Sequence, residues 1–119
     1  MKSKDELKKE YKLNPPEAGI FQIKNRIKGK IFIGSAENVP GILNRHKFEL
    51  KMGIHRNREL QNDYNRDGEQ NFEFTVLEIV NEKKDPDFNY KEELTALKEL
   101  WFEKLQPYGD KGYNKPDPI

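Results

Sequence analysis

Hydrophobic positions along this chain follow two periods, one typical of strands and one typical of helices. Two short apolar runs at about residues 19–24 and 30–35 are rich in isoleucine and phenylalanine, as in strands buried on both faces. Residues 25–29 between them end in a glycine, which favours a hairpin turn. Over 71–80, alternating apolar positions give way to continuous ones, which predicts a third strand that is central or bulged.

Apolar residues spaced three and four apart predict the helices. A first helix begins after Asn38, a good N-cap with Pro40 in the first turn, and ends at Gly53. A second, strongly polar helix is expected over about 56–67. The last helix follows Asn89, which opens a capping-box pattern.

The chain is long enough for one domain and too short for two. It has 119 residues, and we assign residues 15–119 to a single domain. Residues 1–14 are predicted to be a charged helical extension, with the helix over 3–13 ended by two prolines. A loop is expected over 83–89.

Charge and cysteine content narrow the functional classes. With 22 basic and 21 acidic residues the net charge is +1, which argues against tight nonspecific DNA binding by overall charge but leaves room for a local basic patch. The chain has no cysteine and two histidines, so we expect no disulfide and no zinc site. No apolar run is long enough to span a membrane or to form a secretion signal, so we expect a soluble, cytoplasmic protein without a membrane partner.

Several motifs together carry a family resemblance that covers about residues 18–115. They are Gly19-Ile20-Phe21, Ile31-Phe32-Ile33-Gly34-Ser35, His55-Arg56-Asn57, Leu60-Gln61, Trp101 to Pro107 and Gly112-Tyr113-Asn114. In this order they resemble the GIY-YIG nucleases, particularly the phage homing-endonuclease-like branch. The resemblance implies an α/β (α+β) fold in which helices flank a three-stranded antiparallel sheet, here with an extra N-terminal helix. It also implies phosphodiester cleavage that depends on a divalent metal.

The chain departs from the family at four chemical positions. The resemblance implies a tyrosine in each strand motif, an arginine on the first core helix and a metal-binding glutamate on the last helix. The residues at these positions are Phe21, Phe32, Ile42 and Lys98. A phenyl ring has no hydroxyl, isoleucine cannot grip a phosphate, and an ammonium repels a cation. We therefore expect that the chain is not an enzyme and needs no cofactor.

The retained polar groups favour a binding protein. The expected ligand is a nucleotide, a nucleic-acid phosphate or another phosphate-bearing molecule, and sequestration of an immune signal by a phage counter-defence protein in a bacterial host cell would be one use. The predicted ligand-binding residues are Phe21, Phe32, Gly34, Ser35, Arg45, His46, Lys98 and Asn114. The resemblance implies that His46 lies near the scissile phosphate; His55 and Asn57 either touch the ligand or cap the second helix.

Plainer interpretations stay open. Phe21, Phe32 and Ile42 could be core residues, His46 a satisfied core histidine and Lys98 a solvated surface side chain. Alternative functions are a protein–protein inhibitor of a nuclease or defence enzyme, with a host or phage protein as partner, and a weak metal-dependent DNA endonuclease. In the last case Arg45 and Glu99 would replace the lost groups. Dimerisation through the N-terminal helix or a strand edge is compatible with the pattern.

Overall fold

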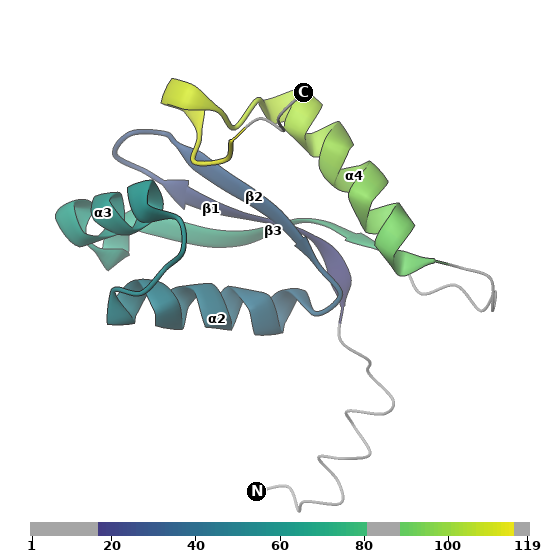
Figure 1. The fold of residues 1–119 in the computed structure, drawn as a ribbon, viewed down its shortest axis with the longest axis horizontal. Helices are drawn as coiled ribbons and strands as arrows, with labels where there is room; N and C mark the ends of the chain where they lie inside the picture. The colour runs from purple at the N-terminus through teal and green to yellow at the C-terminus, as the bar shows by residue number, and fades with distance from the viewer. Residues whose placement is uncertain (1–16, 81–88, 116–119) are drawn as a thin grey trace, which may run out of the picture.

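The computed structural model describes residues 17–80 and 89–115 (Figure 1). The expected helix over 3–13 and nearly all of the expected loop over 83–89 lie outside these residues. The described elements are β1 (Ala18–Asn25), β2 (Ile31–Ala36), α2 (Val39–Met52), α3 (Arg58–Asp67), β3 (Phe72–Val80) and α4 (Tyr90–Leu105). Two short 3-10 turns, Glu69–Asn71 and Gly109–Lys111, precede β3 and follow α4. None of the described helices is long and apolar enough to cross a membrane.

The three strands form one antiparallel sheet in the order β2-β1-β3. Gly29 adopts a positive φ of 73° in the hairpin between β1 and β2, as its position predicts. In β3, Glu78 pairs with Ile20 and Val76 pairs with Phe21, so that Leu77 is an extra residue. The third strand is therefore bulged, which is one of the two forms that the sequence predicts. It is not central, because β1 lies between the other two strands.

Helices cover both faces of the sheet, with α2 and α3 on one face and α4 on the other (Figure 1). Side chains alternate along β1, so Phe21 and Ile23 pack toward α2 and α3 while Ile20 packs toward α4. Since both of its faces are buried, the apolar residues of β1 are nearly continuous in sequence.

Asparagine side chains cap the first turn of each of the three described α-helices. Asn38 accepts a hydrogen bond from the Gly41 N–H at 3.0 Å, and Asn57 accepts one from the Leu60 N–H at 3.0 Å. The helix α3 thus begins two residues later than expected, because His55, Arg56 and Asn57 form the turn that leads into it. At the other end of α2, Gly53 takes the left-handed conformation with φ 77°.

A buried polar network fixes the C-terminal segment next to α3. The Tyr113 hydroxyl donates to Asp63 Oδ2 at 2.7 Å and accepts from Asn25 Nδ2 at 3.1 Å. Further along, Asn114 exchanges two hydrogen bonds of 2.9 Å with the backbone of Ile33 in β2. The segment after α4 is consequently held against β2, where it forms one wall of a cleft.

Candidate functional site

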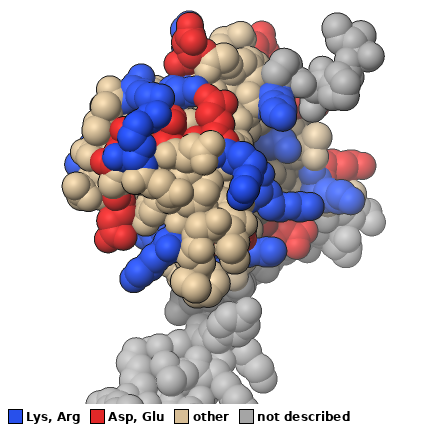
Figure 2. Space-filling model, turned by 60° about the vertical axis from the view of Figure 1, so that its left-hand side comes forward, with Lys and Arg blue, Asp and Glu red and all other residues tan. Residues whose placement is uncertain are grey.

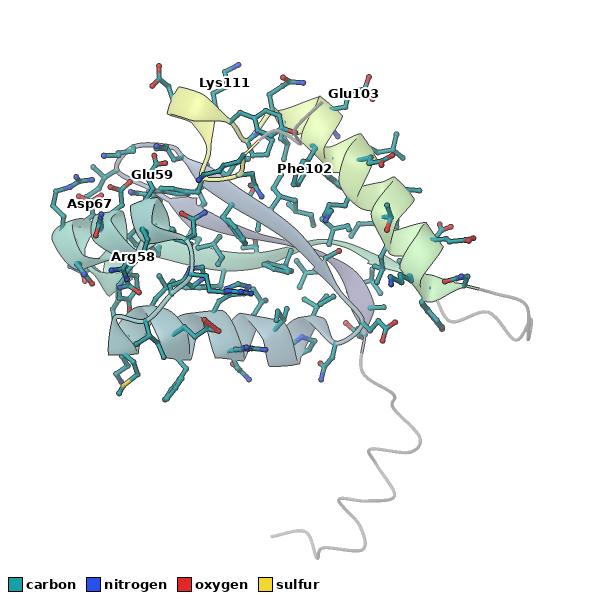
Figure 3. The ribbon with its side chains drawn as sticks, viewed as in Figure 1. Arg58, Glu59, Asp67, Phe102, Glu103 and Lys111 are labelled. Carbon is teal, nitrogen blue, oxygen red and sulfur yellow. The ribbon has the colours of Figure 1, made fainter. Side chains whose placement is uncertain are left out.

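A cleft of about 750 Å³ opens on the α2 and α3 side of the sheet. Its walls come from α2, from the turn that leads into α3, and from the C-terminal segment. Figure 3 shows Arg58 and Glu59 at the first turn of α3, whereas Phe102, a residue of α4, lies on the other side of the sheet. The lining residues are Phe32, Ile42, Arg45, His46, Glu49, His55, Arg56, Asn57, Arg58, Glu59, Tyr113, Asn114 and Lys115.

The rings of two histidines and two phenylalanines pack against one another at the floor of this cleft. His46 Nδ1 and His55 Nε2 are 2.7 Å apart, within hydrogen-bond distance. The Phe32 ring meets His46 and His55 edge-on, with centroid distances of 5.6 and 6.1 Å. The Phe21 ring lies 5.3 Å from His46 and is only 2% exposed, so it supports the floor from below. These contacts bring together four residues that are widely spaced in the sequence.

The surroundings of the histidine pair favour its neutral form. Burial, together with the neighbouring His55, lowers the pKa of His46 to about 4, although the Glu49 carboxylate acts in the opposite direction. Burial also lowers the pKa of His55, again against the effect of Glu49. At neutral pH the floor of the cleft is therefore uncharged.

Positive charge lies at the rim of the cleft. Arg56, Arg58 and Lys115 are exposed, and within the described residues no ion pair engages them. By contrast, Arg45 is held by Glu49, with 2.9 Å between Nε and Oε1. On the side of the molecule that carries α3, Figure 2 shows groups of Lys and Arg interspersed with Asp and Glu. The basic rim is thus a local feature of a nearly neutral surface, and it can attract a phosphate.

Only part of the predicted ligand-binding set lines the cleft. Phe32, Arg45, His46 and Asn114 do, together with Ile42. Both the amide oxygen and the amide nitrogen of Asn114 bond to the Ile33 backbone, so this side chain also ties the tail to β2.

The other predicted positions lie beneath or away from the cleft. Gly34 stands opposite Phe21 in the sheet, and a Cβ at this position would lie 2.5 Å from the Phe21 ring, so glycine is needed for packing. Ser35 pairs with Ile20, which faces α4. Lys98 is on α4 itself, with its Nζ 5.9 Å from the Phe102 ring centroid. Direct ligand contact by Ser35 and Lys98 stays a prediction.

Several lining residues were absent from the sequence-based set. Glu49 could have been found, because it lies three residues after His46 and therefore on the same side of the helix. The positions of Arg58 and Lys115 depend on how α3 and the C-terminal segment pack, which no local pattern indicates.

The donor set does not fit the divalent metal that the family resemblance implies. Where the resemblance implies a metal-binding glutamate, the sequence has Lys98, whose ammonium offers no lone pair. The two carboxylates of the cleft are engaged, Glu49 by Arg45 and Glu59 by Lys30. In residues 17–80 and 89–115, no group of three His, Asp or Glu side chains is arranged to hold a metal ion.

The fold and the motif positions define a nuclease domain class: residues 17–114 match the family model of the GIY-YIG catalytic domain, and the chain belongs to this family. It is 36% identical over 69 residues to Intron-associated endonuclease 1 of Enterobacteria phage T4. The matched stretch covers 58% of this chain and 28% of that relative. The chain therefore corresponds to a minor part of the relative's length.

Solved structures agree with this assignment. The catalytic domain of the homing endonuclease I-TevI is 30% identical, with a TM-score of 0.68 over 84% of this chain and 99% of that one. A single-residue mutant of the same catalytic domain is 29% identical, also with a TM-score of 0.68, over 87% and 97% of the two chains. The predicted family and the three-stranded antiparallel fold are thus confirmed.

The expectation that the chain is not an enzyme is contradicted by the same comparisons. The matching family model is that of a catalytic domain, and the relatives are endonucleases. That expectation rested on the substitution of individual groups, whereas the cleft also holds two histidines and the carboxylates of Glu49 and Glu59.

Proposed function

We propose that this chain is an endonuclease domain that binds and cleaves a nucleic-acid phosphodiester in the cleft between α2, α3 and the C-terminal segment. The observation that carries the proposal is the hydrogen-bonded His46–His55 pair at the floor of the cleft, below the exposed guanidinium groups of Arg56 and Arg58. Family membership supplies the reaction class, and the relatives are endonucleases.

The rim residues bind the nucleic-acid backbone. Arg56, Arg58 and Lys115 are exposed and can replace the counterions of a phosphate chain. Guanidinium groups can also donate two parallel hydrogen bonds to one phosphate. The half-buried Phe32 ring supplies an apolar surface beside the histidines. Together these groups fit a polyanion with flat bases better than a compact uncharged ligand.

Glu49 is the group in the cleft best placed to accept a proton from an attacking water. Its side chain is 17% exposed and pairs with Arg45, which orients the carboxylate. Neither phenylalanine can take this role, and burial makes both histidines weaker bases because it disfavours their protonated form. Glu59, the other carboxylate of the lining, is 55% exposed and pairs with Lys30 at the outer edge.

The test is a cleavage assay with the purified chain on duplex DNA, single-stranded DNA and RNA, with magnesium, with manganese and with a chelator. Glu49→Gln keeps the hydrogen bond with Arg45 but removes the proton acceptor, so cleavage should fall by about 10²–10⁴-fold while binding is kept. Glu59→Gln is the matched control and should cleave like the unmodified chain. Absence of cleavage on every substrate would refute the proposal, and equal losses in the two variants would refute the role of Glu49.

A second candidate ligand is a free nucleotide. A cleft of about 750 Å³ is in the size range of small-molecule sites, and the Phe32 ring lies at its floor. Sequestration of a signalling nucleotide would then be a use of the same cleft. Denaturing the purified protein and analysing the released small molecules tests this candidate, together with thermal shifts across a nucleotide panel. An empty protein that no nucleotide stabilises would exclude it.

A further inference from the structure

We propose that the backbone N–H of Asn57, acting through His55, fixes His46 in one neutral tautomer whose Nε2–H donates to a non-bridging phosphate oxygen. The ligand part of this inference rests on the proposed function, whereas the tautomer part concerns the free protein. The inference follows in three steps from the hydrogen bonds of the described residues. Each step allows one position for the ring hydrogen.

The first step concerns His55. The Asn57 backbone N–H points at His55 Nδ1 from 3.0 Å. A backbone N–H can only donate, so Nδ1 must present a lone pair and carry no hydrogen. A neutral imidazole has one ring hydrogen, and in His55 it must therefore be on Nε2.

The second step transfers this constraint to His46. His55 Nε2 and His46 Nδ1 are 2.7 Å apart. Because His55 carries its hydrogen on Nε2, it is the donor, and His46 Nδ1 is the acceptor. The ring hydrogen of a neutral His46 is then on Nε2, the nitrogen that points away from His55.

The third step places that hydrogen in the cleft. No described residue gives His46 Nε2 a hydrogen-bond partner, since the recorded bond of this ring uses Nδ1. Yet no buried side-chain nitrogen or oxygen among the described residues lacks a partner. Nε2 must therefore reach solvent, and His46 lines the cleft. The free N–H is available to a ligand.

The same chain opposes protonation of either ring. An added proton on His46 would be on Nδ1 and would face the His55 Nε2–H, while an added proton on His55 would face the Asn57 N–H. Burial acts in the same direction on both pKa values. The charged or titratable groups facing the pair are Arg45 and Glu49 of α2, with Arg56, Arg58, Glu59, Tyr113 and Lys115 around the cleft.

These constraints assign different roles to the two histidines. His46 touches the phosphate as a neutral donor, which can stabilise charge growing on an oxygen, and its Nε2 cannot accept a proton from water. His55 acts through His46 and is a positioning residue. The role of proton acceptor is left to another group, consistent with the proposed role of Glu49.

The tautomers can be read directly by nitrogen-15 NMR of the histidine rings in the full, unmodified chain at neutral pH. Both rings should show a hydrogen on Nε2 and none on Nδ1. A hydrogen on His46 Nδ1, or hydrogens on both nitrogens of either ring, would overturn the inference. This experiment needs no ligand and no activity.

Two variants separate a positioning role from a merely structural one. In His55→Gln the amide nitrogen takes the place of Nε2 and can still donate to His46 Nδ1. In His55→Asn the amide oxygen takes the place of Nδ1 and can still accept from Asn57, but the donor to His46 is lost. His46 should keep its tautomer in the glutamine variant and lose it in the asparagine variant, with thermal melting to check that each folds. The same tautomer state in both variants would contradict the relay.

A dinucleoside monophosphate, which contains one phosphodiester, tests the ligand contact. Its addition should shift the His46 Nε2–H signal, and His46→Phe should weaken its binding on the order of tenfold, as for one hydrogen bond to a charged group. No shift at saturation, or no binding, overturns the ligand contact. If the tautomers are as stated but no substrate is cleaved, the proposed function fails alone; if substrates are cleaved but the tautomers differ, this inference fails alone.

Discussion

The two faces of the sheet are built in different ways. On the α4 face, Ile20, Ile31 and Ile33 pack against an apolar helix stripe that includes Leu94. The α2 and α3 face buries apolar residues too, but also the polar residues Asn25, His55, Gln61 and Asp63. Each of these polar side chains has a hydrogen-bond partner. One face is therefore a plain core, and the other combines a core with the positioning of a site.

This contrast shows why polar groups are tolerated in so small a core. Burying an unpaired polar group would cost about 1–3 kcal/mol, a large part of the stability of a domain of this size. The cleft face avoids this cost through connected networks. The same networks hold His55 and Tyr113 in one orientation, so stability and site geometry depend on the same hydrogen bonds.

The largest expected effect is on the plain face. Ile20 is fully buried, so Ile20→Ala should lower the free energy of unfolding by about 2–5 kcal/mol through lost burial and a cavity. Chemical denaturation measures this loss. At temperatures where the variant is folded, the histidine tautomers should be unchanged. A change in them would show that the two faces are coupled.

On the cleft face, Tyr113→Phe should cost about 1–3 kcal/mol, because Asp63 and Asn25 each lose a buried partner. Burial raises the pKa of the Asp63 carboxyl, but the hydrogen bond from Tyr113 and the nearby Lys28 and Arg66 outweigh it and lower the pKa below its ordinary value. Asp63 thus contributes stability above its unfolded pKa, and this is lost as pH falls through the folded value. Denaturation at several pH values should show that Tyr113→Phe loses less unfolding free energy on acidification than the unmodified chain. An identical pH dependence in the two proteins would show that Tyr113 does not lower the pKa of Asp63.

Next in size is the effect of the rim on nucleic-acid binding. Changing both Arg56 and Arg58 to Gln should weaken binding and lower the salt slope of log affinity by about two, one for each lost phosphate contact. Lys98→Gln is the matched control on α4 and should leave both quantities unchanged. Fluorescence anisotropy at several salt concentrations measures them. An equal loss in Lys98→Gln would mean that this lysine reaches the ligand.

The smallest effect is the acid sensitivity of the histidine pair. The pKa of His46 is lowered to about 4 from 6.5, so the unfolded chain binds more protons in this window and stability should fall as pH drops from about 6.5 to about 4. Solvent screening keeps the contribution modest, since the ring is partly exposed. His46→Phe should remove this contribution from the stability profile. A profile unchanged in the variant would show that His46 does not titrate as stated.

Local signals in the sequence predicted the elements well. Asn38 and Gly53 mark the two ends of α2 because capping and the left-handed conformation depend on neighbouring residues only. The site was predicted less completely. Phe32 and His46 were named and line the cleft, whereas Glu49 was missed although it lies on the same helix side. Ser35 and Lys98 were named too but are not among the lining residues, and their contact with a ligand stays a prediction.

The sequence by itself determined the periods, caps and turns of this protein, and its motif order identified the family, because these depend on residues close along the chain or on their order. Only the tertiary structure decided which side chains share the cleft. His46 meets His55 because α2 and the following turn fold back together. Lys98 lies on the other side of the sheet because it belongs to α4, which covers the opposite face. A hydrogen bond of 2.7 Å and a ring tautomer depend on directions in space, which no spacing in the sequence records.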